Sequence, residues 1–186
     1  MSQLRRWKRL DLPAIEDFEE DGATFRGRVV VEEDTPWSVE YLVAFDERWV
    51  TLAAEATVQR AGGSSHLALM RAPTGEWLAN GRELEVCRGF LDVDLGVTPS
   101  TNTSAIRRLG LVVGGTEELT ATWVRFPELT VVPLHQRYTR LADRLYRYES
   151  LRDGAVVFRA ELELDGSGLV ERYEGLFERV GAPAPG

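Results

Sequence analysis

Three long runs of the chain alternate apolar and polar residues with a period of two, which is the pattern of a half-buried β-strand. They are WSVEYLVAF at 37–45, RWVTLAAEATVQR at 48–60 and AVVFRAELEL at 155–164. We expect one face of each strand to pack on the core, with Leu52, Val156 and Phe158 among the inward residues. The same criteria predict shorter strands at 24–33, 66–71, 76–79, 119–126, 130–138, 144–149 and 169–173.

The connections between these runs are short and rich in turn residues. Asp46-Glu47-Arg48, Asp153-Gly154 and Asp165-Gly166-Ser167-Gly168 each leave two to four residues for a reversal, so neighbouring strands must be mostly antiparallel. A long antiparallel meander twists and curls. We therefore predict a mainly β fold, a curled meander forming a barrel or half-barrel, plugged by one or two short helices near 12–19 and 103–109.

Composition narrows the function classes. The 186 residues fit one domain, with 1–10 and 181–186 loosely ordered. The net charge of −8 argues against nucleic acid or an anionic membrane surface as main partner. The single cysteine, Cys87, allows no intrachain disulfide. Neither a signal peptide nor an apolar run of ~20 residues is visible, so we expect a cytoplasmic protein with no integral membrane segment.

The segment LDVDLGVTPSTNTSAIRRLGL, residues 91–111, departs from this strand pattern. Asp92 and Asp94 share one face of a strand, opposite the apolar residues 91, 93 and 95. A calcium loop beginning at Asp92 would need glycine at 97 and glutamate at 103. The sequence has Val97 and Thr103 there, so we predict no metal site.

The second part of this segment predicts a short helix. Thr101, Asn102 and Thr103 are plausible N-caps, and Gly110 fits a left-handed end. Arg107 and Arg108 would point about 100° apart, so one can reach Asp92 or Asp94 while the other faces solvent or a ligand. Ile106 and Leu109 would plug one end of the curled sheet.

Two interpretations of the segment remain open. In the first, a capped helix is tied to a strand by an arginine–carboxylate pair, and the cluster is purely structural. In the second, the same polar groups line the mouth of a pocket and bind a ligand's hydroxyl groups, which both donate and accept hydrogen bonds. Amphipathic residues on nearby strands would then complete the pocket: Trp123, Gln136, Tyr138 and Tyr148.

Several motifs together resemble a bacterial family described as putative glycolipid-binding proteins. They span most of the chain: DVDLG at 92–96, TNT at 101–103, IRRLGL at 106–111, TWVRFPELTVVPLHQRYTRL at 122–141, YRYES at 146–150 and GLVERYEGL at 168–176. The resemblance implies a curled antiparallel sheet with a helical plug, similar to bacterial lipoprotein-carrier half-barrels. It also implies binding of a glycolipid or a similar amphiphile.

The leading hypothesis is a non-catalytic protein that binds an amphiphile in a groove or cavity, without cofactor or metal. Its candidate ligand-binding residues are Asp92, Asp94, Asn102, Arg107, Arg108, Trp123, Gln136, Tyr138 and Tyr148. One alternative is a small enzyme with Asp92 or Asp94 as base and Arg107 or Arg108 binding an anion. Another is a homodimeric interaction module that uses an open sheet edge.

Overall fold

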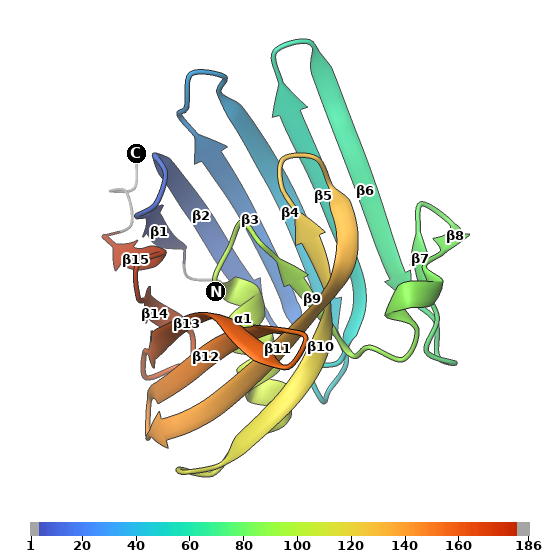
Figure 1. Cartoon of the computed structure of the whole chain (residues 1–186). Coiled ribbons are helices and arrows are strands. Elements are labelled where there is room, and N and C mark those ends of the chain that lie inside the picture. Colours follow the sequence, from blue (N-terminus) through green and yellow to red (C-terminus); the bar gives the residue numbers. More distant parts are fainter. Residues whose placement is uncertain (1–3, 182–186) are drawn as a thin grey trace.

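The computed structural model describes residues 4–181, which form one continuous sheet wrapped around an α-helix (Figure 1). The first strands are β1 (Arg5–Arg9), β2 (Ala14–Asp21), β3 (Thr24–Val31), β4 (Trp37–Phe45), β5 (Thr51–Arg60), β6 (Gly63–Arg71), β7 (Trp77–Ala79) and β8 (Arg82–Glu83). A 3₁₀ turn η1 (Glu85–Cys87), strand β9 (Asp92–Leu95) and helix α1 (Ser100–Leu109) follow. The last strands are β10 (Thr116–Arg125), β11 (Thr130–Ala142), β12 (Leu145–Arg152), β13 (Ala155–Leu164), β14 (Val170–Tyr173) and β15 (Phe177–Val180).

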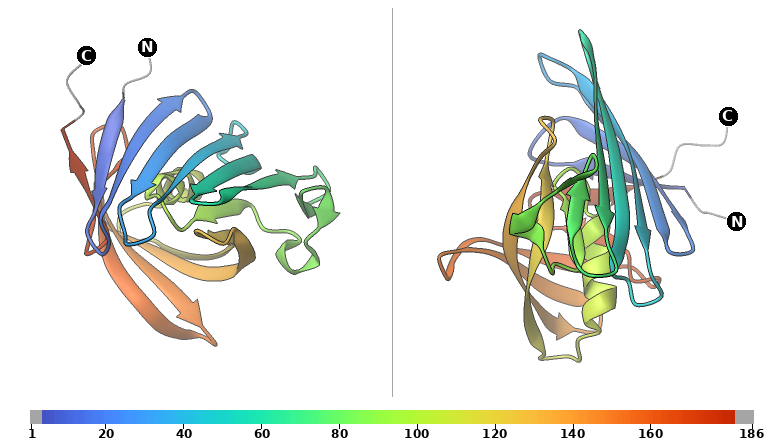
Figure 2. Two further views of the ribbon diagram at one scale, coloured as in Figure 1. Left: turned by 90° about the horizontal axis from the view of Figure 1, so that it is seen from above. Right: turned by 90° about the vertical axis from the view of Figure 1, so that its right-hand side faces the viewer.

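The sheet has two arms joined by its central strands. Its order is β8-β7-β6-β5-β4-β3-β2-β1-β15-β14-β13-β12-β11-β10-β9, and its end strands, β8 and β9, do not pair with each other. Neighbours are antiparallel except β9 and β10. Seen from above, the N-terminal arm (β2–β6) and the C-terminal arm (β10–β13) curl to either side of α1 (Figure 2). The predicted half-barrel with a helical plug is confirmed.

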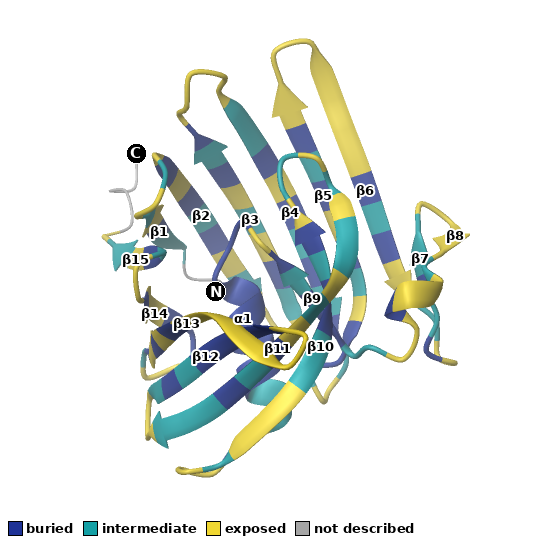
Figure 3. Ribbon diagram, viewed as in Figure 1, coloured by how far each residue is buried: buried dark blue, intermediate teal, exposed yellow. Residues whose placement is uncertain are grey.

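Each arm has its own apolar core, and burial alternates along the strands (Figure 3). The N-terminal core is built on aromatic side chains such as Trp7, Phe18 and Phe25, all with 0% exposure. The C-terminal core collects tyrosines of β11, β12 and β14 around the apolar side of α1, where Ile106 is buried. The helix therefore packs as the predicted plug. Within residues 4–181, no helix is long and apolar enough to cross a bilayer.

Two predictions near the N-terminus are wrong. The expected helix at 12–19 is strand β2, paired with β1 and β3 along its length. Ladder hydrogen bonds and burial of Ala14 and Phe18 outweigh the local helix preference of its acidic residues. Residues 5–9 of the segment expected to be loosely ordered form β1, which joins the two arms. Residues 1–3 and 182–186, also in the segments expected to be loose, lie outside the described residues.

Two of the predicted inward faces are shifted or uncovered at one end. A bulge between β4 and β5 changes the phase of β5, so Thr51 is buried and Leu52 is 44% exposed. In β13 the residues from 160 onward are buried as expected on alternate positions, but Val156 and Phe158 are exposed. The two-residue period of apolar residues therefore predicts both strands correctly. It does not predict which of their apolar residues are buried.

The free edge of β6 is partly occupied by one side chain. Asn80 follows β7, and its backbone N–H donates to the carbonyl of Ala68. Its Oδ1 accepts from the N–H of Ala68 at 2.8 Å, and its Nδ2 reaches the carbonyl of His66 at 3.4 Å. The amide thus takes the place of a further strand residue along an edge that would otherwise be open.

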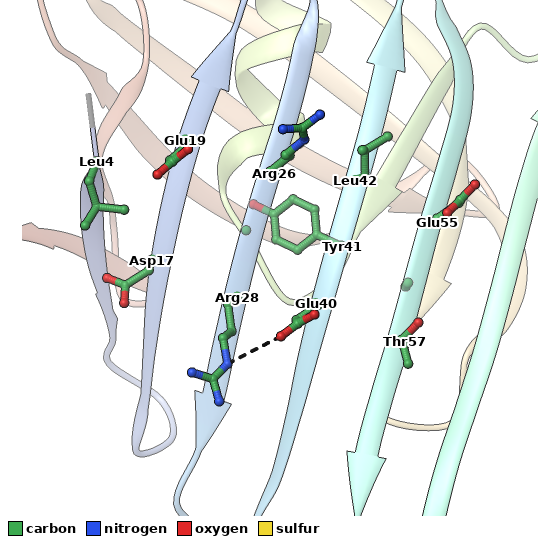
Figure 4. Close-up of a pocket in the computed structure, with 12 residues that line it drawn as sticks. Leu4, Asp17, Glu19, Arg26, Arg28, Glu40, Tyr41, Leu42, Glu55 and Thr57 are labelled. Atoms are coloured by element: carbon green, nitrogen blue, oxygen red, sulfur yellow. Dashed lines mark ion pairs between the residues drawn. The ribbon is translucent and has the colours of Figure 1, made fainter. Parts of the chain in front are cut away.

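A glycine in β3 makes room for an aromatic ring from β4. Tyr41 lies directly opposite Gly27 in the ladder, and its ring crosses β3 at that point (Figure 4). A Cβ atom built on Gly27 would lie 2.4 Å from the ring. Glycine is therefore required at position 27, because the Tyr41 ring leaves no space for a side chain there.

We predict that Gly27→Ala lowers the free energy of unfolding by about 1–3 kcal/mol, because the added methyl group forces the Tyr41 ring to move. Gly166→Ala is the matched control, since nothing lies within 4 Å of its Cβ position. Urea titration of both variants measures the effect. Equal midpoints for Gly27→Ala and Gly166→Ala would contradict this account.

Candidate functional site

Strand β9 separates apolar from acidic side chains as its sequence predicts. Val93 and Leu95 are buried in the N-terminal core. Asp92 and Asp94 lie opposite Ala121 and Trp123 in the parallel ladder with β10. The two aspartates are directed toward the region between α1 and the C-terminal arm, where each finds a different partner.

The first turns of α1 are polar and buried, and their side chains bind strands of both arms. Thr101 Oγ1 accepts from the backbone N–H of Leu95 and Thr103 Oγ1 accepts from the N–H of Val170, each at 3.2 Å. Asn102 Nδ2 donates to the Tyr138 hydroxyl at 2.9 Å. The helix begins after Pro99, without a side-chain cap. The residues expected as N-caps therefore hold the helix in place instead.

Both arginines of α1 are bound to carboxylates. Arg108 makes a two-pronged pair with Asp92, at 2.7 Å for each contact. Arg107 pairs with Glu20 of β2, and its guanidinium lies 4.3 Å from the Trp49 ring centroid. Gly110 ends the helix with φ of 57°, as predicted. The predicted link from an arginine to the acidic pair is confirmed for Arg108.

Four of the nine candidate residues line one pocket, called the site pocket below. It has a volume of about 290 Å³ and lies between α1, β9 and the C-terminal arm. Asp94 comes from β9, Asn102 from α1, Trp123 from β10 and Tyr148 from β12. Thus the structure brings together residues separated by more than fifty positions in the sequence.

Two more candidates form a layer behind the pocket. Gln136 Nε2 donates to Asp94 Oδ2, and the Tyr138 hydroxyl reaches Gln136 Oε1 at 3.4 Å. Each is 1% exposed, so they orient pocket residues without lining the pocket. Burial, helped by the charge of Asp92, raises the pKa of Asp94 to about 6 despite the hydrogen bond from Gln136, which lowers it. The remaining candidates, Asp92, Arg107 and Arg108, form the ion pairs described above.

Much of the pocket wall consists of residues that we did not select from the sequence. Phe158, Tyr173 and Phe177 supply aromatic surface, while Arg9 and Thr98 supply polar groups. Arg9 and Phe177 belong to strands at the joint between the arms. Only the pairing of β1 with β15 brings them to this place.

A buried carboxylic acid lies behind Thr98. Glu16 of β2 is 2% exposed, and its Oε1 accepts from the hydroxyls of Tyr41 and Thr98. Its Oε2 is buried without a partner in the described residues. Burial raises the pKa of Glu16 to about 8, more than the hydroxyl groups lower it. Glu16 is buried on the same face of β2 as Ala14 and Phe18. The alternation of these residues could have identified Glu16 as inward-facing, but we predicted a helix for this segment.

A second depression lies on the opposite face of the N-terminal arm (Figure 4). It measures about 450 Å³, and half of its lining residues are charged, among them Asp17, Arg26 and Glu55. The Arg28–Glu40 pair there spans 3.8 Å, with side chains 63% and 76% exposed. Exposed pairs of this kind contribute little energy. Despite its larger volume, this depression is a solvated charged surface.

Within residues 4–181, no three His, Cys, Asp or Glu side chains gather closely enough to hold a metal ion. Of the other reactive groups, Cys87 is fully buried in the N-terminal core. His66 and His135 are exposed on strands, each bonded to a threonine hydroxyl. The site pocket is thus the place where polar and aromatic groups converge.

Comparison with known proteins gives one family and one structure. A family model described as putative glycolipid-binding matches residues 5–179. The crystal structure of a DUF1089 family protein from Pseudomonas aeruginosa is similar, with 32% identity and a TM-score of 0.83. The similarity covers 90% of this chain and 92% of that chain. No curated protein matches the chain.

We predict that Asp92→Ala lowers the free energy of unfolding by about 2–4 kcal/mol, because it leaves the Arg108 guanidinium, whose side chain is only 15% exposed, without its partner. Burial already raises the pKa of Asp92 despite Arg108, so the pair compensates charges that are costly to bury. Glu40→Ala, which breaks an exposed pair with Arg28, should cost about 0–1 kcal/mol. Denaturant titration compares the two, and similar losses would show that the Asp92 pair is not buried in solution.

Glu16 should make the unliganded protein less stable as the pH rises. Its folded pKa of about 8 lies above the ordinary value of 4.5. The stabilisation from the bound proton is therefore complete below about pH 4.5 and is lost as the pH rises through about 8. The stability of Glu16→Gln relative to wild type should increase across that interval.

The corresponding gain for Asp94→Asn should develop between about pH 4 and 6, because the pKa of Asp94 is raised only to about 6. Urea titrations from pH 4 to 9 measure both differences. If the difference in stability between Glu16→Gln and wild type did not change with pH, the raised pKa of Glu16 would be refuted.

Proposed function

The chain belongs to the family described as putative glycolipid-binding, and from this premise we propose that it binds an amphiphilic molecule of glycolipid type in the site pocket, without catalysis. A hydroxylated head group would bind Asp94 and Asn102. The apolar part would lie against the aromatic wall. The observation that carries the proposal is the convergence of Asp94, Asn102, Trp123 and Tyr148 on one pocket.

The polar side of the pocket has acceptors available for hydroxyl groups. Within residues 4–181, Asp94 uses Oδ2 for Gln136 and Asn102 uses Nδ2 for Tyr138. The Oδ1 atom of each residue therefore remains able to accept a hydrogen bond. A carboxylate and an amide oxygen that line the same pocket suit the hydroxyl groups of a sugar ring. Because Gln136 and Tyr138 fix these side chains, little orientation entropy is lost on binding.

Much of the remaining pocket lining is aromatic. The rings of Tyr148 and Tyr173 lie 5.8 Å apart, and those of Tyr173 and Phe177 lie 6.0 Å apart. Phe158 continues this wall and is 37% exposed. Aromatic faces of this kind bind the C–H face of a sugar or an alkyl chain. Aromatic rings and fixed acceptors in one pocket favour an amphiphile over a fully polar ligand.

The enzymatic alternative has less support. Asp94, with a pKa of about 6, could act as a base near neutral pH. However, the arginines that would bind the anion are engaged, Arg108 with Asp92 and Arg107 with Glu20. The geometry therefore favours recognition of hydroxyl groups over turnover of an anionic substrate.

We predict that octyl β-D-glucoside, kept below its micellar concentration, binds the detergent-free protein at pH 7.5. Asp94→Asn should weaken binding about tenfold or more, because it removes a charged acceptor. Asp143→Ala, in which the altered side chain is 91% exposed and far from the pocket lining, is the control. Isothermal titration calorimetry measures the three affinities. No binding by wild type, or equal affinity in Asp94→Asn, would refute the proposed site.

A further inference from the structure

The wall beside the site pocket contains a gap between β11 and the β12–β13 hairpin. The β11–β12 ladder begins only at His135 and Leu151, so residues 130–134 of β11 pair with β10 alone. A bulge at Ser150 and Leu151 interrupts the β12–β13 register at the same level. Bulges bend a strand away from its neighbour. The hairpin therefore diverges from β11 beside the pocket.

Another cavity, distinct from the charged depression on the N-terminal arm and called the side cleft below, occupies this gap. It has a volume of about 610 Å³. Trp123, Leu134 and Ser150 line both the side cleft and the site pocket. The two spaces therefore meet at these three side chains, of which Ser150 is the smallest.

The start of β13 is exposed (Figure 3), and three of the residues there are large and apolar. Val156, Val157 and Phe158 are consecutive and are 39%, 54% and 37% exposed. Phe158 lines the site pocket, and Val157 lines the side cleft. A strand with one solvated face would alternate polar residues here. The run is suited to contact with apolar material on both of its faces.

We infer that, if the proposed function holds, the alkyl chain of the ligand leaves the site pocket past Ser150 and lies in the side cleft. The site pocket, at about 290 Å³, is at the lower end of the range for small-molecule sites. Its hydrogen-bonding groups favour the head group there. Val132, Leu134, Leu151 and Val157 supply apolar surface to the cleft. Its lining also includes charged and polar side chains, namely Glu118, Arg125, His135, Arg137, Arg152 and Asp153. The ligand class is thus a single-chain amphiphile with an uncharged, hydroxylated head.

The test is a series of methyl, hexyl and octyl β-D-glucosides, titrated calorimetrically below their micellar concentrations. For wild type, affinity should rise with chain length by up to about fourfold for each methylene buried. Val157→Asp places a charge in the side cleft alone. It should remove most of this increase and leave the affinity for methyl glucoside unchanged. Ser150→Phe, which fills the passage, should also remove the increase.

Val113→Asp is the control, because Val113 is 58% exposed and lines neither cavity. It should keep the full dependence on chain length. If methyl glucoside binds but longer chains add nothing, the inference is overturned and the head-group site stands. If Val157→Asp and Ser150→Phe both retain the dependence seen in Val113→Asp, the chain lies elsewhere and the inference is also overturned. If no glucoside binds wild type, the proposed function fails and the inference fails with it.

Discussion

The two arms of the sheet are held in position by the hydrogen-bonding side chains at the buried start of α1. Ser100 contacts Tyr41 of the N-terminal arm, and Asn102 bonds to Tyr138 of the C-terminal arm. Thr101 and Thr103 each accept from a strand backbone. A buried polar group without a partner costs about 1–3 kcal/mol, so moving either arm away from the helix would leave several such groups unpaired. The width of the site pocket follows from this constraint, because α1 supplies one of its walls.

Strand β9 links this constraint to the chemistry of the site. Its apolar face completes the N-terminal core, while Asp92 anchors the end of α1 and Asp94 reaches the pocket. As the first interpretation expects, Asp92 and the two arginines form ion pairs. Asp94 and Asn102 line the site pocket, and the second interpretation, that they bind a ligand, stays a prediction. Gly96, directly after β9, allows the Trp123 ring to approach the chain closely, since a Cβ there would lie 2.8 Å from Trp123 Nε1.

Local pattern was sufficient to predict most of the strands, their mainly antiparallel pairing and the helix with its left-handed end, because each depends on neighbours in sequence. It did not predict β1, β2, β8 or β15. It was insufficient at Glu16, where an acidic run favoured a helix and the pairing with β1 and β3 made a strand. It also missed Arg9 and Phe177, which reach the pocket only through the β1–β15 pairing. A bulge explains the misplaced face of β5, since one extra residue reverses the inward phase. In β13 the phase is kept, but residues 155–159 are all exposed because that end of the strand lies beyond the packed core.

The side chain of Asn80 has a consequence for the protein in a crowded solution. A half-barrel keeps an unclosed margin, and identical molecules could add to one another along β6 as successive strands. Asn80 already satisfies both the N–H and the carbonyl of Ala68, so a second copy would have to displace an intramolecular amide before it gained anything. The amide of Asn80 therefore opposes strand addition at this point of β6, in a sheet whose two end strands do not pair with each other.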